Sequence, residues 1–267
     1  TYDFGGPVRW GESAGEAQET THRDEGATFG LRVTPVDGLA IKANRGRVTR
    51  LPTFPELFGT NSVQDGNPRL RPERGLQWDT GIEIAPRAPI RVESTYFERL
   101  IEDQIYLLQN SQRTVKADNL DRAWVRGVET VVLTTMPLPA ETRLEVQANY
   151  TWTEAIDVGH SRTYHGKRIP NLPRNEAYVS SLFRRGVWDL RWEVIARSSS
   201  FWHRYNQEEQ KTPGSVIHDL SLERSLFGEG WNARIEIRNI GDERTEDIDG
   251  YPLPGRTVHA GLTWIAS

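Results

Sequence analysis

Residues 144–152 of the chain read LEVQANYTW, and in this stretch every second residue is apolar. From Leu144 to Trp152 the apolar side chains fall on one face of an extended strand, and the polar ones fall on the other. The same alternation recurs at 188–194 and 231–238, where the polar positions carry full charges. These stretches predict β-strands with one apolar and one charged face.

About twelve segments of the chain read as strands, and several contain ten or more residues, which exceeds the five or six that are typical of soluble proteins. A tilted strand that crosses a membrane needs roughly 9–11 residues. The connections alternate between short and long ones. The short links lie at 35–38, 86–89, 135–141, 186 and 227–230, and the long links at 11–27, 49–75, 109–121, 155–173, 199–214 and 241–255. An up-and-down sheet with tight turns at one rim and long loops at the other explains this alternation, and outer-membrane barrels have that asymmetry.

The composition excludes several classes of protein. The net charge of −4 argues against nucleic-acid binding, and the absence of cysteine excludes disulfides, thiol catalysis and zinc–thiolate sites. No apolar run is long enough for a spanning helix. The chain opens with TYDFGG rather than a leader, so we expect a removed signal peptide or a missing N-terminal part. A polar soluble β-protein fits the same composition and remains an alternative at this point.

Tryptophans cluster near the ends of the expected strands, as in the aromatic girdles of membrane barrels. They are Trp10, Trp78, Trp124, Trp152, Trp188, Trp231 and Trp264. The ordinary preference of tryptophan for strands explains any single one of them equally well.

Two consecutive long links combine aromatic rings with cations, which suits a flat, anionic, metal-chelating ligand through stacking and charge. The candidate ligand-binding residues are Tyr164, Arg168, Trp202, His203, Arg204 and Tyr205. Packing of the loops on one another is the alternative interpretation.

The charged faces of the strands predict a wet barrel interior. The candidate lumen-facing residues are Glu145, Asp189, Arg191, Glu193, Arg234 and Glu236.

Other chemistry is weakly indicated. Loop histidines such as His160 and His203 lack further ligands at motif spacing, and the acidic loop 242–249 matches no calcium motif, so we predict no metal site and no cofactor. His218 and Asp219 are neighbours that point to opposite faces of a strand, and no nucleophile elbow is present. We therefore predict no catalytic residues and no enzyme activity.

Several motifs in chain order resemble those of TonB-dependent outer-membrane receptors. The first is the run 50–58, RLPTFPELF, followed by GNPRLRPE at 66–73. The region 119–129 is similar to a later strand signature of the family, and IPNLP at 169–173 to the link before another strand. The closing region is the most specific, because NIGDE at 239–243 and GYPLPGR at 250–256 resemble the family pattern before the last strand.

This resemblance implies a bacterial outer-membrane barrel of about 22 strands around an N-terminal plug. It implies import of a scarce nutrient complex, such as a ferric siderophore, with energy from TonB. With about twelve strands and nothing that reads as a plug, residues 1–267 look like the C-terminal portion of the barrel as a single domain. The expected partners are outer-membrane lipid, the N-terminal barrel half and plug, TonB through that plug, and a metal-chelate cargo. The end at Trp264-Ile265-Ala266-Ser267 departs from the aromatic terminus that is usual in the family. A self-contained twelve-strand pore or barrel enzyme is the alternative.

Overall fold

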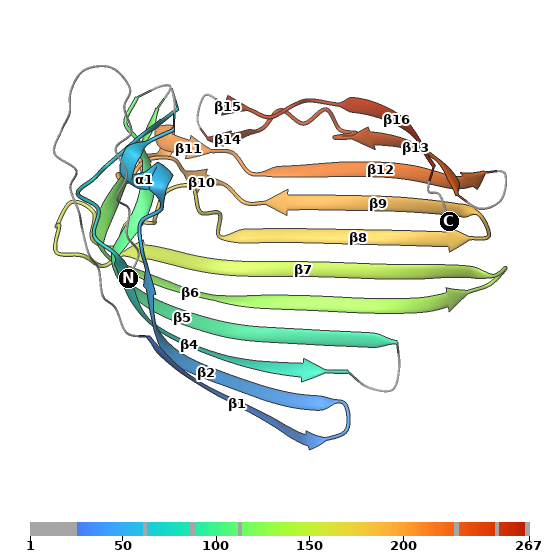
Figure 1. The fold of residues 1–267 in the computed structure, drawn as a ribbon, viewed down its shortest axis with the longest axis horizontal. Helices are drawn as coiled ribbons and strands as arrows, with labels where there is room; N and C mark the ends of the chain where they lie inside the picture. The colour runs from blue at the N-terminus through green and yellow to red at the C-terminus, as the bar shows by residue number, and fades with distance from the viewer. Residues whose placement is uncertain are drawn as a thin grey trace.

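The computed structural model describes residues 26–60, 63–85, 89–111, 114–226, 230–248 and 251–264. These residues form one twelve-stranded sheet, in which eleven strands make an antiparallel meander and the short β3 adds a parallel pair to β6 (Figure 1). The meander consists of β1 (Ala27–Val36), β2 (Leu39–Arg50), β4 (Glu73–Ile84), β5 (Ile90–Gln109), β6 (Val115–Leu138), β7 (Thr142–Asp157), β8 (Asn175–Arg185), β9 (Trp188–Arg197), β12 (Ser215–Leu226), β13 (Trp231–Arg238) and β16 (Thr257–Trp264). The prediction of an all-β, up-and-down sheet of long strands is confirmed.

With one exception, the short connection between β5 and β6, the connections sort by length onto opposite ends of the sheet (Figure 1). Tight turns join β1 to β2 and β8 to β9, where Gly38 and Gly186 adopt positive φ values of 80° and 57°. The opposite end carries all the small elements, namely α1 (Phe54–Phe58), β3 (Gln64–Asp65), β10 (Ser200–Phe201), η1 (Glu208–Gln210), β11 (Lys211–Thr212), β14 (Glu246–Ile248) and β15 (Tyr251–Pro252). We call this the loop end. The predicted link 11–27 and Trp10 lie almost entirely outside the described residues.

One predicted long link is wrong. Residues 115–121, which fall in the expected link 109–121, belong to β6 and pair with β5, so that only 110–114 connect the two strands. The segment reads as a loop because Lys116, Asp118 and Asn119 are polar, but Ala117 and Leu120 are fully buried. The β5–β6 hairpin therefore extends past the other strands at the loop end, where side chains need not be apolar. At the opposite end β6 continues to Leu138 and shortens the predicted link 135–141.

The register assigns every strand residue to one of two faces. Leu144, Phe183, Leu190, Leu222 and Ile235 are successive partners across β7, β8, β9, β12 and β13, and they form an apolar row. Their sequence neighbours form a charged or polar row on the other side. We name these two sides the apolar face and the polar face.

No other protein layer covers the apolar face within the described residues. Phe29 is 73% exposed and Trp264 is 59% exposed, and Trp188, Trp192 and Trp231 are also exposed. The two clusters of buried apolar residues instead gather at the loop end, around Leu120 and Ile169 in one case and Leu70, Ile105 and Ala117 in the other. A soluble β-protein would bury its tryptophan-bearing face, so this alternative is not supported. No helix among the described residues is long and apolar enough to cross a membrane.

The sheet is open. Within the described residues β1 pairs only with β2, and β16 pairs only with β13, so the barrel is not closed. A self-contained twelve-strand cylinder, the alternative considered from the sequence, is therefore not what these residues form. Unpaired strand edges are not tolerated in hydrocarbon, so an outer-membrane sheet of this shape needs further strands at both edges.

Gly127 in β6 provides a test of how closely the strands and their side chains approach on the polar face. A Cβ atom there would lie 2.3 Å from the Trp152 carbonyl oxygen and 2.6 Å from the Phe97 ring. We expect Gly127→Val to destabilise the barrel by about 1–3 kcal/mol, because the buried Phe97 must move. Samples of the full receptor are heated to a series of temperatures and then run on a gel that preserves folded protein. The measurement is the temperature at which the folded band disappears.

Gly261→Val in β16 is the matched control, because no atom lies within 4 Å of its ideal Cβ position. An equal loss of thermal stability in both variants would contradict the proposed steric conflict at Gly127.

Candidate functional site

Two of the long connections, 158–174 and 198–214, are hydrogen-bonded to each other. Asn206 has a positive φ of 54°. Its side-chain amide makes the pair of backbone hydrogen bonds that a residue of a neighbouring strand would make. Its Oδ1 accepts a hydrogen bond from Arg168 N at 2.6 Å, and its Nδ2 donates to Arg168 O at 3.1 Å. In addition, Asn171 N donates to Phe201 O at 2.6 Å. These bonds hold the two loops in one fixed arrangement.

The fastened loops bring an aromatic cluster together, consisting of Tyr164, Trp202, His203, Arg204 and Tyr205. The Tyr164 and Tyr205 ring centroids are 5.4 Å apart, and His203 stacks on Tyr205 at 5.0 Å. Trp202 meets His203 edge-on at 5.8 Å. The Arg204 guanidinium carbon lies 3.9 Å from the centre of the Tyr164 ring. A hydrogen bond with Tyr205, assisted by burial, raises the pKa of the Tyr164 phenol.

A buried carboxylate positions the arginine of this cluster. The Asp157 side chain is 5% exposed, and its Oδ2 accepts a hydrogen bond from Arg204 Nη2 at 2.9 Å. Its Oδ1 accepts from the backbone N–H of Gly159 at 2.9 Å. Loss of one partner of such a buried pair costs about 3–5 kcal/mol. Arg204 therefore serves largely to hold the loop onto the end of β7, and its charge is balanced within the chain.

A cavity of about 250 Å³ opens beside the aromatic cluster. Its lining residues are Leu108, Asn110, Lys116, Asp118, Tyr164, Trp202, His203 and Arg204. Lys116 is exposed and forms no ion pair with any described residue. The cavity therefore combines aromatic rings with an ammonium group that forms no ion pair among the described residues, and the Asp118 carboxylate also lines it.

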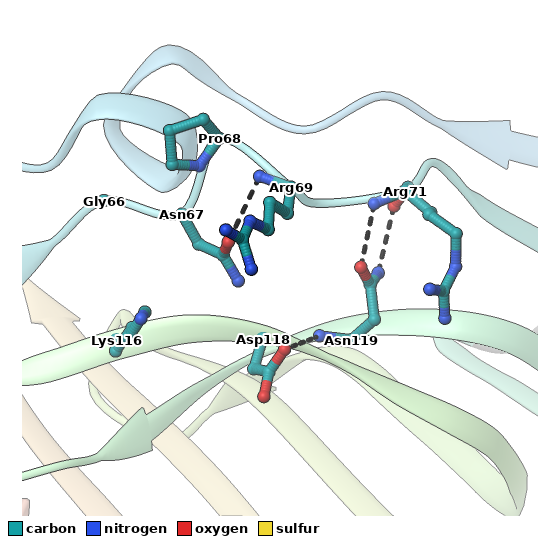
Figure 2. A pocket seen from close by; sticks show the side chains of 8 residues that line it. All are labelled: Gly66, Asn67, Pro68, Arg69, Arg71, Lys116, Asp118 and Asn119. Carbon is teal, nitrogen blue, oxygen red and sulfur yellow. Dashed lines mark hydrogen bonds between the residues drawn. The ribbon is translucent and has the colours of Figure 1, made fainter.

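A larger cavity of about 1090 Å³ shares Lys116 and Asp118 with the first one and continues under the connection between β3 and β4 (Figure 2). Asn119 of β6 holds the segment around Arg71 above the strand through hydrogen bonds to its backbone. The Asn119 Oδ1 accepts from Arg71 N at 2.8 Å, and its Nδ2 donates to Arg71 O at 3.0 Å and to Asp103 O at 2.6 Å. The hydrogen bond to Asp103 raises the pKa of the Arg71 guanidinium.

Arg69 projects into the same cavity from the segment around Arg71 (Figure 2), and it forms no ion pair with a described residue. Arg69 and Lys116 are thus two cations without ion-pair partners among the described residues, on opposite walls of the larger cavity (Figure 2). The two cavities together offer positive charge and aromatic surface at the loop end of the sheet.

Five of the six ligand-binding residues predicted from the sequence come together in the aromatic cluster, and four of these line the smaller cavity. The sixth, Arg168, lies elsewhere. Its guanidinium donates to Leu172 O at 3.1 Å and lies 5.5 Å from the Phe201 ring, and burial lowers its pKa. Arg168 therefore contributes to loop packing.

Lys116 and Asp118 were missed by the sequence reasoning, because their segment was expected to be a loop. The alternation of apolar and polar residues from Val115 to Ala117 was the available signal.

The six candidate lumen-facing residues share the polar face. Arg191 pairs with Ser221, which pairs with Glu236, and Asp189 pairs with Glu223, which pairs with Arg234. Glu145 and Glu193 occupy the same face of their strands. Ion pairs link several members of the set, including Arg184 with Glu145 at 3.3 Å.

The loop histidines and acidic residues make ordinary contacts. His160 lies 2.8 Å from the Asp121 carboxylate, and His165 contacts the carbonyl oxygen of Gly159 at 3.0 Å. Among the described residues no three histidine, aspartate or glutamate side chains converge as a metal site would require. Asp249, part of the acidic loop, lies outside the described residues.

Solved structures with the same fold are receptors and transporters. The siderophore receptor PiuA from Acinetobacter baumannii is 14% identical, with a TM-score of 0.69, and the match covers 89% of this chain and 35% of that one. The ferric enterobactin receptor PfeA from Pseudomonas aeruginosa is 17% identical, with a TM-score of 0.66, over 90% of this chain and 40% of that one. The copper transporter OprC is 14% identical, with a TM-score of 0.67, over 89% and 38%. The chain thus spans two fifths or less of the length of these proteins.

Residues 20–240 match the family described as TonB dependent receptor-like, beta-barrel. This match covers most of the chain, includes the motif at 50–73 and agrees with the meander and its asymmetric ends. It is a family of receptors rather than of enzymes, which confirms the prediction that the chain is not an enzyme. The chain therefore belongs to the TonB-dependent receptor β-barrel family, whose members reside in the bacterial outer membrane.

Proposed function

We propose that this chain is the C-terminal portion of a barrel that captures an anionic metal chelate at the cell surface and imports it in a TonB-dependent way. The observation that carries the proposal is the pair of cavities at the loop end that share Lys116, one lined by residues of the aromatic cluster and the other by Arg69. Aromatic faces stack on flat ligands, and cations without internal partners attract negative charge. The family match supports import and dependence on TonB as parts of this proposal.

The similar structures favour a ferric siderophore as the cargo. Their printed names include a ferric enterobactin receptor and a siderophore receptor, and the cavity chemistry fits the aromatic, negatively charged rings of a ferric catecholate. Copper transport, the activity named for OprC, is a second candidate. It is less well supported, because no group of metal-ligating side chains converges among the described residues.

The other barrel strands and the plug would belong to the rest of the receptor. β1 and β16 would pair with the other barrel strands, and a plug inside the barrel would contact TonB. The polar face, with Glu145, Arg191 and Glu236, would then line the lumen and contact that plug. This arrangement follows from the open edges of the sheet and from the distribution of charge between its faces.

The cargo proposal predicts weaker binding when the cavity loses its charge or its indole. We expect Lys116→Gln and Trp202→Ala in the full receptor each to weaken binding of ferric enterobactin by about tenfold, equivalent to about 1.4 kcal/mol. That is the size expected for one charge-assisted contact or one stacked ring. The measurement is a titration of the detergent-solubilised receptor, followed by protein fluorescence for Lys116→Gln and by retained radiolabelled iron for both variants.

Lys167→Gln is the matched control, because this exposed lysine lies in the same group of loops but does not line either cavity. Wild-type affinity in both cavity variants would refute the assignment of this site. Binding of copper ions but not ferric enterobactin by the wild-type receptor would favour the second candidate.

The lumen proposal predicts that two adjacent positions of β9 differ in their accessibility to water-soluble reagents. This chain contains no cysteine, so a single substitution introduces the only thiol within it. In intact outer membranes we expect Arg191→Cys to react with a small water-soluble maleimide at least tenfold faster than Trp192→Cys. Arg191 is on the polar face, whereas 42%-exposed Trp192 is on the apolar face. Equal rates, or the reverse order, would show that the faces are assigned wrongly.

A further inference from the structure

Two arginines of β2 lie on the apolar face of the sheet. Arg45 pairs in register with Phe29 on one side and Trp78 on the other, and Arg47 pairs with Ala27 and Leu76. Both arginines are exposed, and neither forms an ion pair with a described residue. They are thus cations on the surface that faces lipid in an outer-membrane barrel.

Their position along the strand places them at the edge of the apolar band. On the apolar face of β2, Leu39, Ile41 and Ala43 precede Arg45 from the short-turn end. On β7 the corresponding apolar run ends at Trp152, and Glu154 follows it. Charge therefore begins toward the loop end, which is the outer side of an outer-membrane barrel.

The register connects these charges into one row across the sheet. Trp78 pairs with Glu98, Glu98 with Arg126, and Arg126 with Glu154, so that Arg45 begins a continuous row over five strands. Because barrel strands are tilted, the row runs obliquely to the bilayer plane, and it marks where charge begins on the apolar face of these strands.

The acids of the row are already satisfied within the chain. Glu98 accepts hydrogen bonds from Tyr96 Oη and Trp124 Nε1, both at 3.0 Å. Glu154 accepts from Arg126 Nε at 2.9 Å, and Arg174 Nη2 lies 3.4 Å from its other oxygen. Neither carboxylate approaches Arg45 or Arg47 as an ion-pair partner.

A cation on a lipid-facing surface requires a counter-charge. Because the neighbouring acids are engaged, the counter-charge for Arg45 and Arg47 must come from outside the described chain. Guanidinium groups match phosphate geometry through paired N–H donors. Phe29 beside Arg45, together with Leu31 and Ile41 toward the short-turn end, offers an exposed apolar surface, which suits acyl chains.

We propose that Arg45 and Arg47 bind the phosphate groups of lipid A, the phosphorylated and acylated disaccharide of the outer leaflet, with its acyl chains on the apolar surface that begins at Phe29. The site is separate from the cavities that line the loop end, so it stands independently of the cargo. It gives the barrel a specific lipid contact at one defined position on its circumference.

The test uses the full receptor, extracted in mild detergent, and native mass spectrometry to count retained lipid A molecules. We expect Arg45→Gln/Arg47→Gln to lower the retained lipid A by about tenfold at limiting lipid. The matched control is Arg185→Gln/Arg224→Gln, which removes two arginines from the apolar face at the short-turn end and is expected to leave retention unchanged.

A second experiment uses only the wild-type receptor. It therefore tests the proposal even if the doubly substituted receptor does not fold. The wild-type receptor is offered lipid A, chemically dephosphorylated lipid A or phosphatidylglycerol, and we expect retention of lipid A to exceed that of the other two at least tenfold. Equal retention of lipid A and its dephosphorylated form would overturn the proposal, as would equal retention of phosphatidylglycerol. Equal loss in the two arginine pairs would also overturn it, since it would indicate attraction by charge anywhere on the barrel.

Discussion

The antiparallel hydrogen-bond ladder, with its strict two-residue alternation, is the constraint on which the rest of this structure depends. In a bilayer each backbone N–H and C=O must be satisfied by a neighbouring strand, since lipid supplies no partners. The ladder from β1 to β16 meets this demand, and its register sets Leu144, Phe183 and Leu190 in one row and Glu145, Leu182 and Arg191 in the next. A slip by one residue would move charges to the lipid side along a whole strand. The short turns at one end keep this register fixed.

The loop end obeys a different rule, because there the protein is out of the membrane and can bury apolar side chains against itself. The β5–β6 hairpin rises beyond the other strands and supplies the surface for this packing. Leu57 and Leu70 fold onto Ile105 and Ala117, and Ile169 packs near Leu120. Both cavities use β6 as one wall and loops as the other. Their shape therefore depends on small hydrophobic clusters and on single polar clamps such as Asn119 and Asn206, rather than on the sheet alone.

The sequence predicts the sheet well because alternation is a local property. The strands at 215–226 and 231–238 begin and end in the structure where the pattern places them. The sequence predicts the extended β6 poorly. Outside the bilayer no lipid requires one face of a strand to be apolar, so Lys116 and Asp118 look like loop residues. The site is predicted in part, since Tyr164 and Trp202 are visible as an aromatic and cationic concentration. Lys116 joins them only through the fold, and no local pattern reports that contact. Arg168 shows the converse, because an arginine next to aromatic residues in sequence packs on Phe201 rather than facing the cavity.

Arginines beside aromatic rings occur in several places in this chain, and the pairing by itself does not identify a binding site. Arg204 lies over Tyr164, but its charge is balanced by the buried Asp157. Arg126 lies 4.4 Å from the Trp124 ring centre, and it is bound by Glu154. What distinguishes a cation that is available to a ligand is the absence of such an internal acid. By that criterion Lys116 marks the loop end, where an anionic solute would arrive from water, and Arg45 marks the apolar face, where an anion would be presented by the membrane. The same criterion thus identifies two places of anion recognition in this chain.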